Sequence, residues 1–229
     1  YNLSLTFTNV KKRIERNDSW LEKREKFFRD IYLKCVLHSK SKYNILEKFN
    51  VFCDFRHTQL SNYQNQEKIN VINTNPPTNE NMKKIIQKMI NEYLNLLGYD
   101  LVIATRLDSD DGLNYNYTDK LIEYIFSKKI LKNKCVYFKN FVQFRLHDHK
   151  FSLRSEKNPN VLSFLNFGKS QEILNPSNYN HAIVDASIDT DKIMDCKPMF
   201  VQSIHDINVG NEFQEKPYRG GEFEFLIRS

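Results

Sequence analysis

Residues 100–112 read Asp-Leu-Val-Ile-Ala-Thr-Arg-Leu-Asp-Ser-Asp-Asp-Gly, an apolar run that leads directly into a group of acids. A short, continuous apolar run predicts a strand buried on both faces, as in a sheet covered by helices. We therefore expect a strand over residues 100–107, with Asp108, Asp110 and Asp111 just beyond its carboxyl end. In open α/β sheets, ligands bind beyond that end of the strands.

Strand and helix patterns alternate along the first 130 residues or so. Apolar and β-branched runs predict strands at 3–8, 50–55 and 68–72, and helical spacing of apolar residues predicts helices at 20–33, 79–97 and 118–128. This alternation predicts an α/β fold with a mostly parallel sheet flanked by helices. Later, shorter strands predict a less regular C-terminal half: 135–141, 142–146, 182–187 and 199–203. We expect one domain over 1–211, with 212–229 as an arm or the start of a further segment.

The composition suits a folded domain with an anionic partner. Apolar residues make up 40% of the chain, and the net charge is +6. The excess lies in residues 1–60, which predicts contact with a diphosphate, an acidic lipid surface or nucleic acid, or simply a solvated helix face. No apolar run approaches the roughly 20 residues of a membrane span, so a cytoplasmic protein with peripheral contact to an acidic membrane is the expectation.

The cysteines Cys35, Cys53, Cys135 and Cys196 form no Cys-x-x-Cys pair. Three of them stand in apolar runs. We expect buried free thiols in a reducing compartment and no zinc site.

Carboxylates gathered at a strand end repel one another unless a cation joins them. Oxygen ligands favour Mg²⁺ or Mn²⁺, which typically complete their shells with substrate phosphates. Two other interpretations remain. The acids could be a capped turn with solvated aspartates, or a calcium loop, although Gly112 stands one position too early for that loop and its closing glutamate is missing.

Two later segments carry candidate side chains. His205 ends the apolar run that begins at Met199, where it is either a structural histidine or a metal ligand. Asp148, between His147 and His149, is the candidate general base for an acceptor hydroxyl, and Asp111 is assigned to catalysis with it. The alternative for Asp148 is a solvated loop carboxylate.

Several motifs in this order resemble the rhamnosyltransferase family of bacterial GT-A-like glycosyltransferases. The Arg-Leu-Asp-x-Asp-Asp block is the most specific of them, and the resemblance covers most of the chain. The motifs are Trp20-Leu21-x-x-Arg24-x-x-Phe27-Phe28, Cys35-x-Leu37-x-Ser39, Phe49-x-Val51-x-x-Asp54-x-x-x-Thr58, Thr105-Arg106-Leu107-Asp108-Ser109-Asp110-Asp111 and Phe200-Val201-Gln202-Ser203-Ile204-His205-Asp206-x-Asn208-x-x-Asn211.

The resemblance implies a GT-A-like, Rossmann-like fold, a nucleotide-diphosphate sugar as donor, Mn²⁺ or Mg²⁺, and a glycan or glycolipid acceptor. It implies metal ligation by Asp108, Asp110 and His205. Nucleotide binding is assigned to Thr8, Asp54, Arg106 and Asp108. One departure stands at Asn166, where the family pattern leads us to expect an acid.

The reaction expected is a displacement at the anomeric carbon, with inversion if the base lies across that carbon from the metal. A nucleotidyltransferase or phosphohydrolase could use the same acids, though such enzymes typically want a second metal. A non-catalytic glycan- or nucleic-acid-binding domain is the remaining alternative. Nucleic acid is not expected, because the acids at the strand end would oppose a phosphate backbone.

Overall fold

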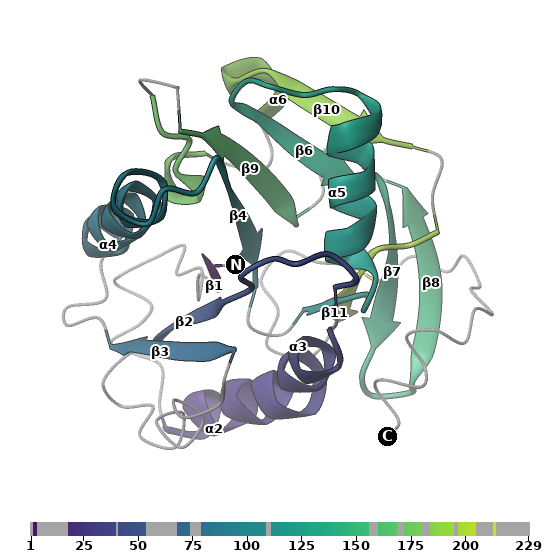
Figure 1. Cartoon of the computed structure of the whole chain (residues 1–229). Helices are drawn as coiled ribbons and strands as arrows, with labels where there is room; N and C mark the ends of the chain where they lie inside the picture. Colours follow the sequence, from purple (N-terminus) through teal and green to yellow (C-terminus); the bar gives the residue numbers. More distant parts are fainter. Residues whose placement is uncertain are drawn as a thin grey trace.

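The computed structural model describes residues 2–3, 18–39, 41–53, 68–73, 79–108, 111–155, 160–168, 172–179, 184–194, 197–204 and 213. Within them, helices cover both faces of a central sheet, and a smaller sheet stands beside it (Figure 1). The strands of the central sheet are β1 (Asn2–Leu3), β2 (Phe49–Cys53), β3 (Ile69–Asn73), β4 (Leu101–Leu107), β6 (Lys134–Phe138), β9 (Leu162–Phe167) and β10 (Thr190–Ile193).

The central sheet has the order β10-β6-β9-β4-β1-β2-β3. The strands β4, β1, β2 and β3 are parallel neighbours, and β10 is parallel to β6. Strand β9 lies between β4 and β6 and is antiparallel to both. The α/β class is therefore confirmed, but the sheet is mixed rather than the mostly parallel, Rossmann-like sheet expected. The reason is that β9, within a stretch where we predicted no strand, inserts between two parallel strands.

Strand β4 is apolar at five of its seven positions because each of its faces meets a different core. Leu101, Ile103 and Leu107 pack into the core that also holds Phe28 and Leu121, whereas Val102 and Ala104 pack into the core that holds Ile86. Successive side chains of a strand point to opposite faces, so a doubly covered strand needs apolar residues at nearly every position.

Three helical segments are long, and their expected positions are confirmed. A continuous run is formed by α2 (Asp18–Phe27), the π-helical turn η1 (Phe28–Leu33) and α3 (Lys34–His38). It shares one face with α5 (Tyr117–Ser127). The opposite face carries α4 (Asn79–Asn91), its π-helical continuation η3 (Glu92–Leu96), the short 3₁₀ turn η4 (Pro176–Asn178) and α6 (Val184–Ser187). No helix of the described residues is both long enough and apolar enough to cross a membrane.

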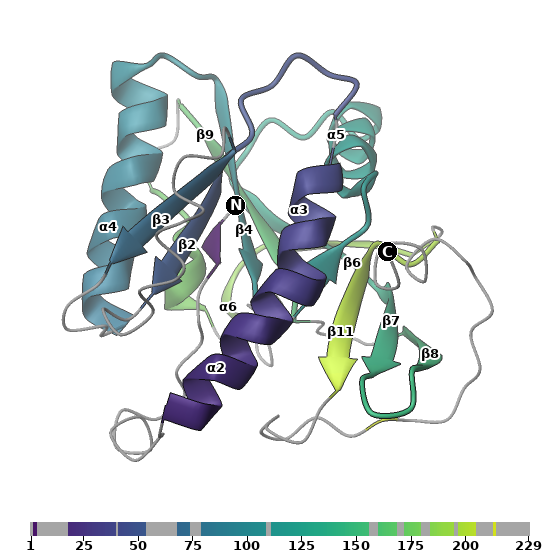
Figure 2. The ribbon, with the colours of Figure 1, turned by 90° about the horizontal axis from the view of Figure 1, so that it is seen from below.

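The smaller sheet has the order β5-β11-β7-β8. Its strands are β5 (Gly112–Leu113), β7 (Asn140–Arg145), β8 (Lys150–Ser155) and β11 (Phe200–Ile204). Strand β11 is parallel to β7 and antiparallel to β5. Because β5 follows the acids directly, this sheet sits against the end of β4. Figure 2 shows β4 and β11 running in the same direction.

Two sequence predictions for the C-terminal half are corrected. The strand expected at 182–187 is helix α6 over the residues that the structure describes there, and Asp185 in it accepts hydrogen bonds from Tyr137 and Thr190. Strands β8, β9 and β10 were not predicted. Of the expected arm at 212–229, only Phe213 is described, and its ring lies 4.3 Å from the Arg145 guanidinium carbon.

The thiols of Cys35 and Cys135 are buried and free, as the sequence predicts for them. Burial raises the pKa of Cys35 to about 12 and raises that of Cys135 as well. Because the thiolate is the nucleophile, we expect neither thiol to react with iodoacetamide at neutral pH in the native protein, and both to react in urea. Peptide mapping by mass spectrometry would check this, and native labelling of either thiol would contradict the core described above.

Candidate active site

The order of the central sheet defines the place where a ligand is expected. The chain moves outward from β1 through β2 to β3, then returns to place β4 on the other side of β1. The carboxyl ends of β1 and β4 therefore form a topological switch point, the place where open α/β sheets bind their ligands. Asp108 follows the last residue of β4, so it stands at this switch point.

Asp111 is a buried connector between the two sheets. Its side chain is 2% exposed, and its Oδ1 accepts a hydrogen bond of 3.0 Å from the backbone N–H of Ser203 in β11. Its own N–H donates to the carbonyl of Asp108 over 3.1 Å, which closes the turn between β4 and β5. Because this carboxylate accepts from a buried backbone donor, it helps to hold the turn in place. The catalytic part assigned to Asp111 from the sequence stays a prediction.

The pairing of β5 with β11 brings the end of β11 toward the acids. Val201 lies opposite Gly112 in this antiparallel pair, and the chain of β11 then runs past Asp111 to Ile204. His205 is the next residue. His205 and Asp110 themselves lie outside the described residues, so the predicted metal set is represented by Asp108 alone. Within the described part of the chain, no three His, Cys, Asp or Glu side chains gather as a metal site.

Arg106 presents an unsatisfied donor beside Asp108. Its Nη1 donates to the backbone oxygen of Tyr179 over 3.4 Å, while its Nε is buried without a hydrogen-bond partner. A buried charged donor without a partner is costly, which makes it a candidate for binding a ligand. Arg106 and Asp108 are two residues apart, the spacing at which an extended chain turns side chains to the same face.

The remaining nucleotide-site predictions concern residues that follow β1 and β2. Thr8 and Asp54 lie outside the described residues. Strands β1, β2 and β4 are parallel, with Leu3 paired to both Val51 and Leu107. The ends of β2 and β4 therefore share one edge of the sheet, which we call the carboxyl edge. Asp54 is the residue that follows Cys53, the last residue of β2.

The structure does not favour Asp148 as a base. Arg145 donates from Nε to Oδ1 over 2.8 Å and from Nη2 to Oδ2 over 2.6 Å, within the turn that joins β7 to β8. This bidentate pair holds the pKa of the Asp148 carboxyl well below its usual range. An efficient general base has a pKa near the working pH, so the pair is better explained as a clamp on the hairpin.

Asn166 is a structural residue far from the acids. It is fully buried in β9, its amide donates to the carbonyls of Phe164 and Leu174, and its oxygen accepts from the N–H of Leu174. Because β9 is antiparallel to β4, Asn166 pairs with Val102 near the start of β4. An acid at this position would lie at the opposite end of β4 from Asp108, so its absence removes nothing from the candidate site.

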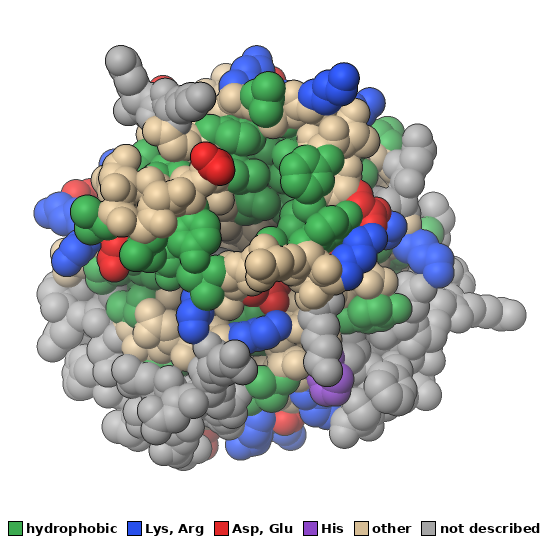
Figure 3. Space-filling model, viewed as in Figure 1, with side chains coloured by type: hydrophobic (Ala, Val, Ile, Leu, Met, Phe, Trp, Pro, Cys, Tyr) green, Lys and Arg blue, Asp and Glu red, His purple; other side chains and the backbone are tan. Residues whose placement is uncertain are grey.

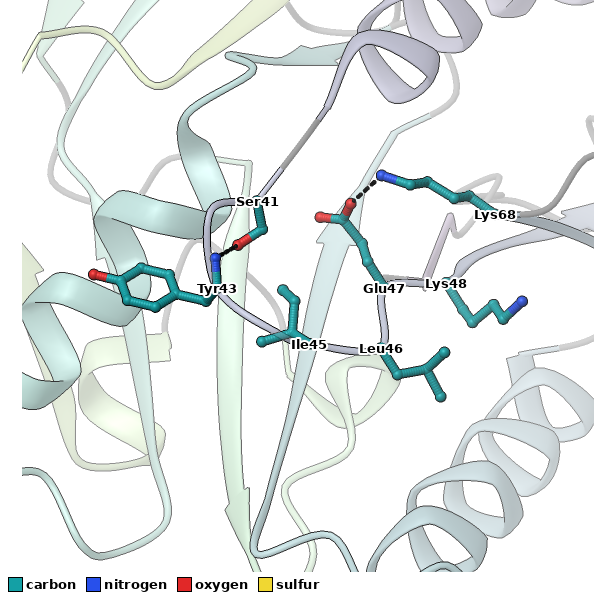
Figure 4. A pocket seen from close by; sticks show the side chains of 7 residues that line it. All are labelled: Ser41, Tyr43, Ile45, Leu46, Glu47, Lys48 and Lys68. Carbon is teal, nitrogen blue, oxygen red and sulfur yellow. Dashed lines mark hydrogen bonds and ion pairs between the residues drawn. The ribbon is translucent and has the colours of Figure 1, made fainter.

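A pocket of about 350 Å³ lies at the other edge of the sheet, where β2 and β3 begin (Figure 4). Its lining comes from the loop before β2 and from Lys68: Ser41, Tyr43, Ile45, Leu46, Glu47, Lys48 and Lys68. Glu47 and Lys68 point toward one another across it, with 2.9 Å between Oε2 and Nζ. This pair is part of the packing around β2 and does not belong to the carboxyl-edge site.

No protein-family model matches the chain, and no curated protein matches it. The resemblance to the rhamnosyltransferase family is therefore not confirmed. Among solved structures, the chain is similar to S. aureus TarS, residues 1–349, with a TM-score of 0.44 and 12% identity. The similarity covers 79% of this chain and 57% of that one, so the chain spans a little over half the length of that structure.

Proposed function

We propose that the protein is a metal-dependent glycosyltransferase that transfers a sugar from a nucleotide-diphosphate donor to a hydroxyl of a glycan or glycolipid. The observation that carries the proposal is the location of the acid turn. Asp108 stands at the switch point beside β1, and Asp111 ties the same turn to β11, the strand that precedes His205. Asp108 and the end of β11 therefore lie at one edge of the sheet, which supports a site that includes the residues following each strand.

The unsatisfied Arg106 Nε supports an anionic ligand at this edge. No carboxylate of the described residues forms an ion pair with Arg106, although the guanidinium is charged at any physiological pH. Arginine binds phosphate oxygens through paired N–H donors. We assign Arg106 to the diphosphate of the donor, with Asp54 and Thr8 toward its nucleoside.

The acids fit a divalent cation. Asp108 is half-buried at the end of β4, and oxygen ligands suit Mg²⁺ and Mn²⁺. In our proposal Asp108, Asp110 and His205 would hold the ion. When bound, such an ion neutralises charge on the leaving diphosphate.

The transfer itself requires little covalent participation by the protein. The acceptor oxygen forms a bond to the anomeric carbon, the bond from that carbon to the diphosphate breaks, and its electron pair leaves with the diphosphate. The acceptor proton passes to a basic group within hydrogen-bond reach. Arg106 orients the diphosphate, and Asp111 keeps the turn that carries Asp108 in place.

A thermal-shift screen of nucleoside diphosphates and nucleotide sugars, with and without Mn²⁺, tests the proposal. A ligand that binds only the folded state at a hundred times its Kd adds about 2.7 kcal/mol of stability. We expect a rise in Tm for at least one nucleotide sugar with Mn²⁺, and its loss in Asp108→Asn. In Arg106→Gln, affinity should fall at least about tenfold, because a charged hydrogen bond is lost.

Asp100→Asn is the matched control, since Asp100 is an exposed acid immediately before the same strand, at its opposite end. The control should bind as the wild type does. Mn²⁺-dependent binding that survives Asp108→Asn would refute the metal assignment. A shift with nucleoside triphosphates but with no nucleotide sugar would instead indicate nucleotidyl transfer.

A further inference from the structure

The turn between α5 and β6 combines exposed apolar side chains with lysines. Phe126 is 68% exposed and Leu131 is 82% exposed, which places both among the three most exposed large apolar side chains of the described residues. Lys128, Lys129 and Lys132 stand between and beside them, and no acid occurs from residue 124 to residue 134. We call Phe126, Lys128, Lys129, Leu131 and Lys132 the α5–β6 surface.

The backbone of this turn is well fixed. The N–H of Ile130 donates to the carbonyl of Ile125, and that of Lys129 donates to Phe126, which together form the Schellman ending of a helix. Lys129 occupies the left-handed position with φ of 51°, where glycine is usual. Ile130 is buried as a result, and Leu131 is directed into solvent. Asn133 then fixes the exit of the turn by accepting from the N–H of Phe167 over 2.7 Å.

The α5–β6 surface lies on the edge opposite the candidate site. Strand β6 begins just after it, and β6 and β4 run in the same direction because both are antiparallel to β9. Leu96 and Leu97, which are also exposed, precede β4 on this same edge. Figure 3 looks at this edge and shows Lys and Arg side chains above hydrophobic ones near the end of α5.

Neighbouring acids leave the surface positive. Glu123 is held by Lys42 and Lys120, at 2.6 Å and 2.7 Å. Asp189 is shared between Lys132 and the largely buried Lys134. Glu92 and Asp100 stand at the α4–β4 connection rather than within the turn. Lys128 and Lys129 have no ion pair among the described residues, and Lys128 lies 6.0 Å from the ring centroid of Tyr124.

We infer that the α5–β6 surface docks the protein on an anionic lipid bilayer, with Phe126 and Leu131 inserted among the headgroups and the lysines against lipid phosphates. Apolar side chains flanked by lysines are the pattern of interfacial membrane binding. A second copy of the chain fits less well. Two-fold pairing would bring like lysines together, and two apolar side chains are far fewer than a stable interface of about 800 Å² per partner needs. The inference is independent of the proposed function.

Sedimentation of the full chain with vesicles tests the inference. We expect binding to vesicles of phosphatidylcholine mixed with phosphatidylglycerol, little binding to phosphatidylcholine alone, and weaker binding at high salt. Phe126→Ser/Leu131→Ser and Lys128→Glu/Lys129→Glu should each lower the partition at least about tenfold. These positions are exposed, and nucleotide binding at the opposite edge should be unchanged.

Matched controls come from exposed residues outside the α5–β6 surface. Met194→Ser changes an apolar side chain that is 49% exposed after the end of β10, and Lys84→Glu reverses an exposed lysine on α4. Both should bind vesicles as the wild type does. Equal loss in the controls, or equal binding to neutral and anionic vesicles, would overturn the inference. The absence of vesicle binding would also overturn the inference. Analytical ultracentrifugation would then show whether the surface pairs two copies of the chain, because Phe126→Ser/Leu131→Ser should dissociate such a dimer.

Discussion

Replacing Gly112 by alanine should lower the free energy of unfolding by roughly 2 kcal/mol, within the range for overpacked sites. An added Cβ would lie 2.5 Å from Sγ of Cys35 and 3.0 Å from Cγ1 of Val201. Both neighbours are buried, at 1% and 0% exposure, so neither can move aside freely. Because Gly112 follows Asp111 directly, the forced shift of β5 should also disturb the Asp111–Ser203 connection and weaken nucleotide binding.

Urea unfolding of a double-mutant cycle would isolate this contact. Cys35→Ala removes the Sγ atom that Gly112→Ala would meet, so the double variant should be more stable than Gly112→Ala alone. Cys35→Ala in the wild-type background should instead destabilise slightly, by about 1 kcal/mol, because it leaves a small cavity. Strict additivity of the two changes would show that Gly112 is not limited by Cys35.

Replacing Glu47 by alanine should cost about 2–4 kcal/mol, near the lower part of the range for breaking a buried ion pair. Its side chain is 4% exposed and accepts from Lys68 Nζ and Thr118 Oγ1, both over 2.9 Å, and from Ser39 Oγ over 3.3 Å. The carboxylate therefore joins the end of α3, the start of α5 and the residue before β3. We place the cost below the maximum because Lys68 is a third exposed and can regain water.

The urea midpoint of Glu47→Ala, Glu47→Gln and Glu47→Leu/Lys68→Met would test this role. Glu47→Gln keeps an acceptor for Thr118 and should lose less stability than Glu47→Ala. The double variant leaves no ammonium without its partner, so it should recover part of the loss. Substitutions at the surface usually change the free energy of unfolding by no more than about 0.5 kcal/mol. A Glu47→Ala protein within that range of the wild type would show that the hydrogen bonds of Glu47 do not stabilise the fold.

Much of the fold follows from local pattern. The apolar run of β4, the helical spacing around Phe28 and Ile31, and the helix from Asn79 were all predicted. Strands β8 and β10 were missed because most of their residues are polar, so neither contains an apolar run that marks a strand. An apolar stretch around α6 suggested a strand, but the segment is helical. Its Asp185 accepts hydrogen bonds from Tyr137 of β6 and Lys192 of β10, which are contacts that the local pattern does not reveal.

In the candidate site, too, the sequence indicated some residues and left the contacts of others open. The sequence indicated Asp108 and Arg106, because an apolar strand followed by acids is visible without knowing what surrounds it. It did not indicate that Asp111 is buried against Ser203, since that contact joins residues 92 positions apart. Nor did it show that Asp148 accepts hydrogen bonds from Arg145. The pattern of apolar residues does not reveal which charged side chains in a turn form an ion pair.

The sequence by itself determined that strands and helices alternate, and that a buried strand delivers Asp108 to its carboxyl end, because periodicity and burial act over a few neighbouring residues. Only the tertiary structure decided the direction of β9, which makes the sheet mixed and carries Asn166 to the edge opposite Asp108. It also decided that β11 lies beside the acid turn. Pairing between distant strands depends on the packing of whole faces and on long loop closures, which local patterns leave open.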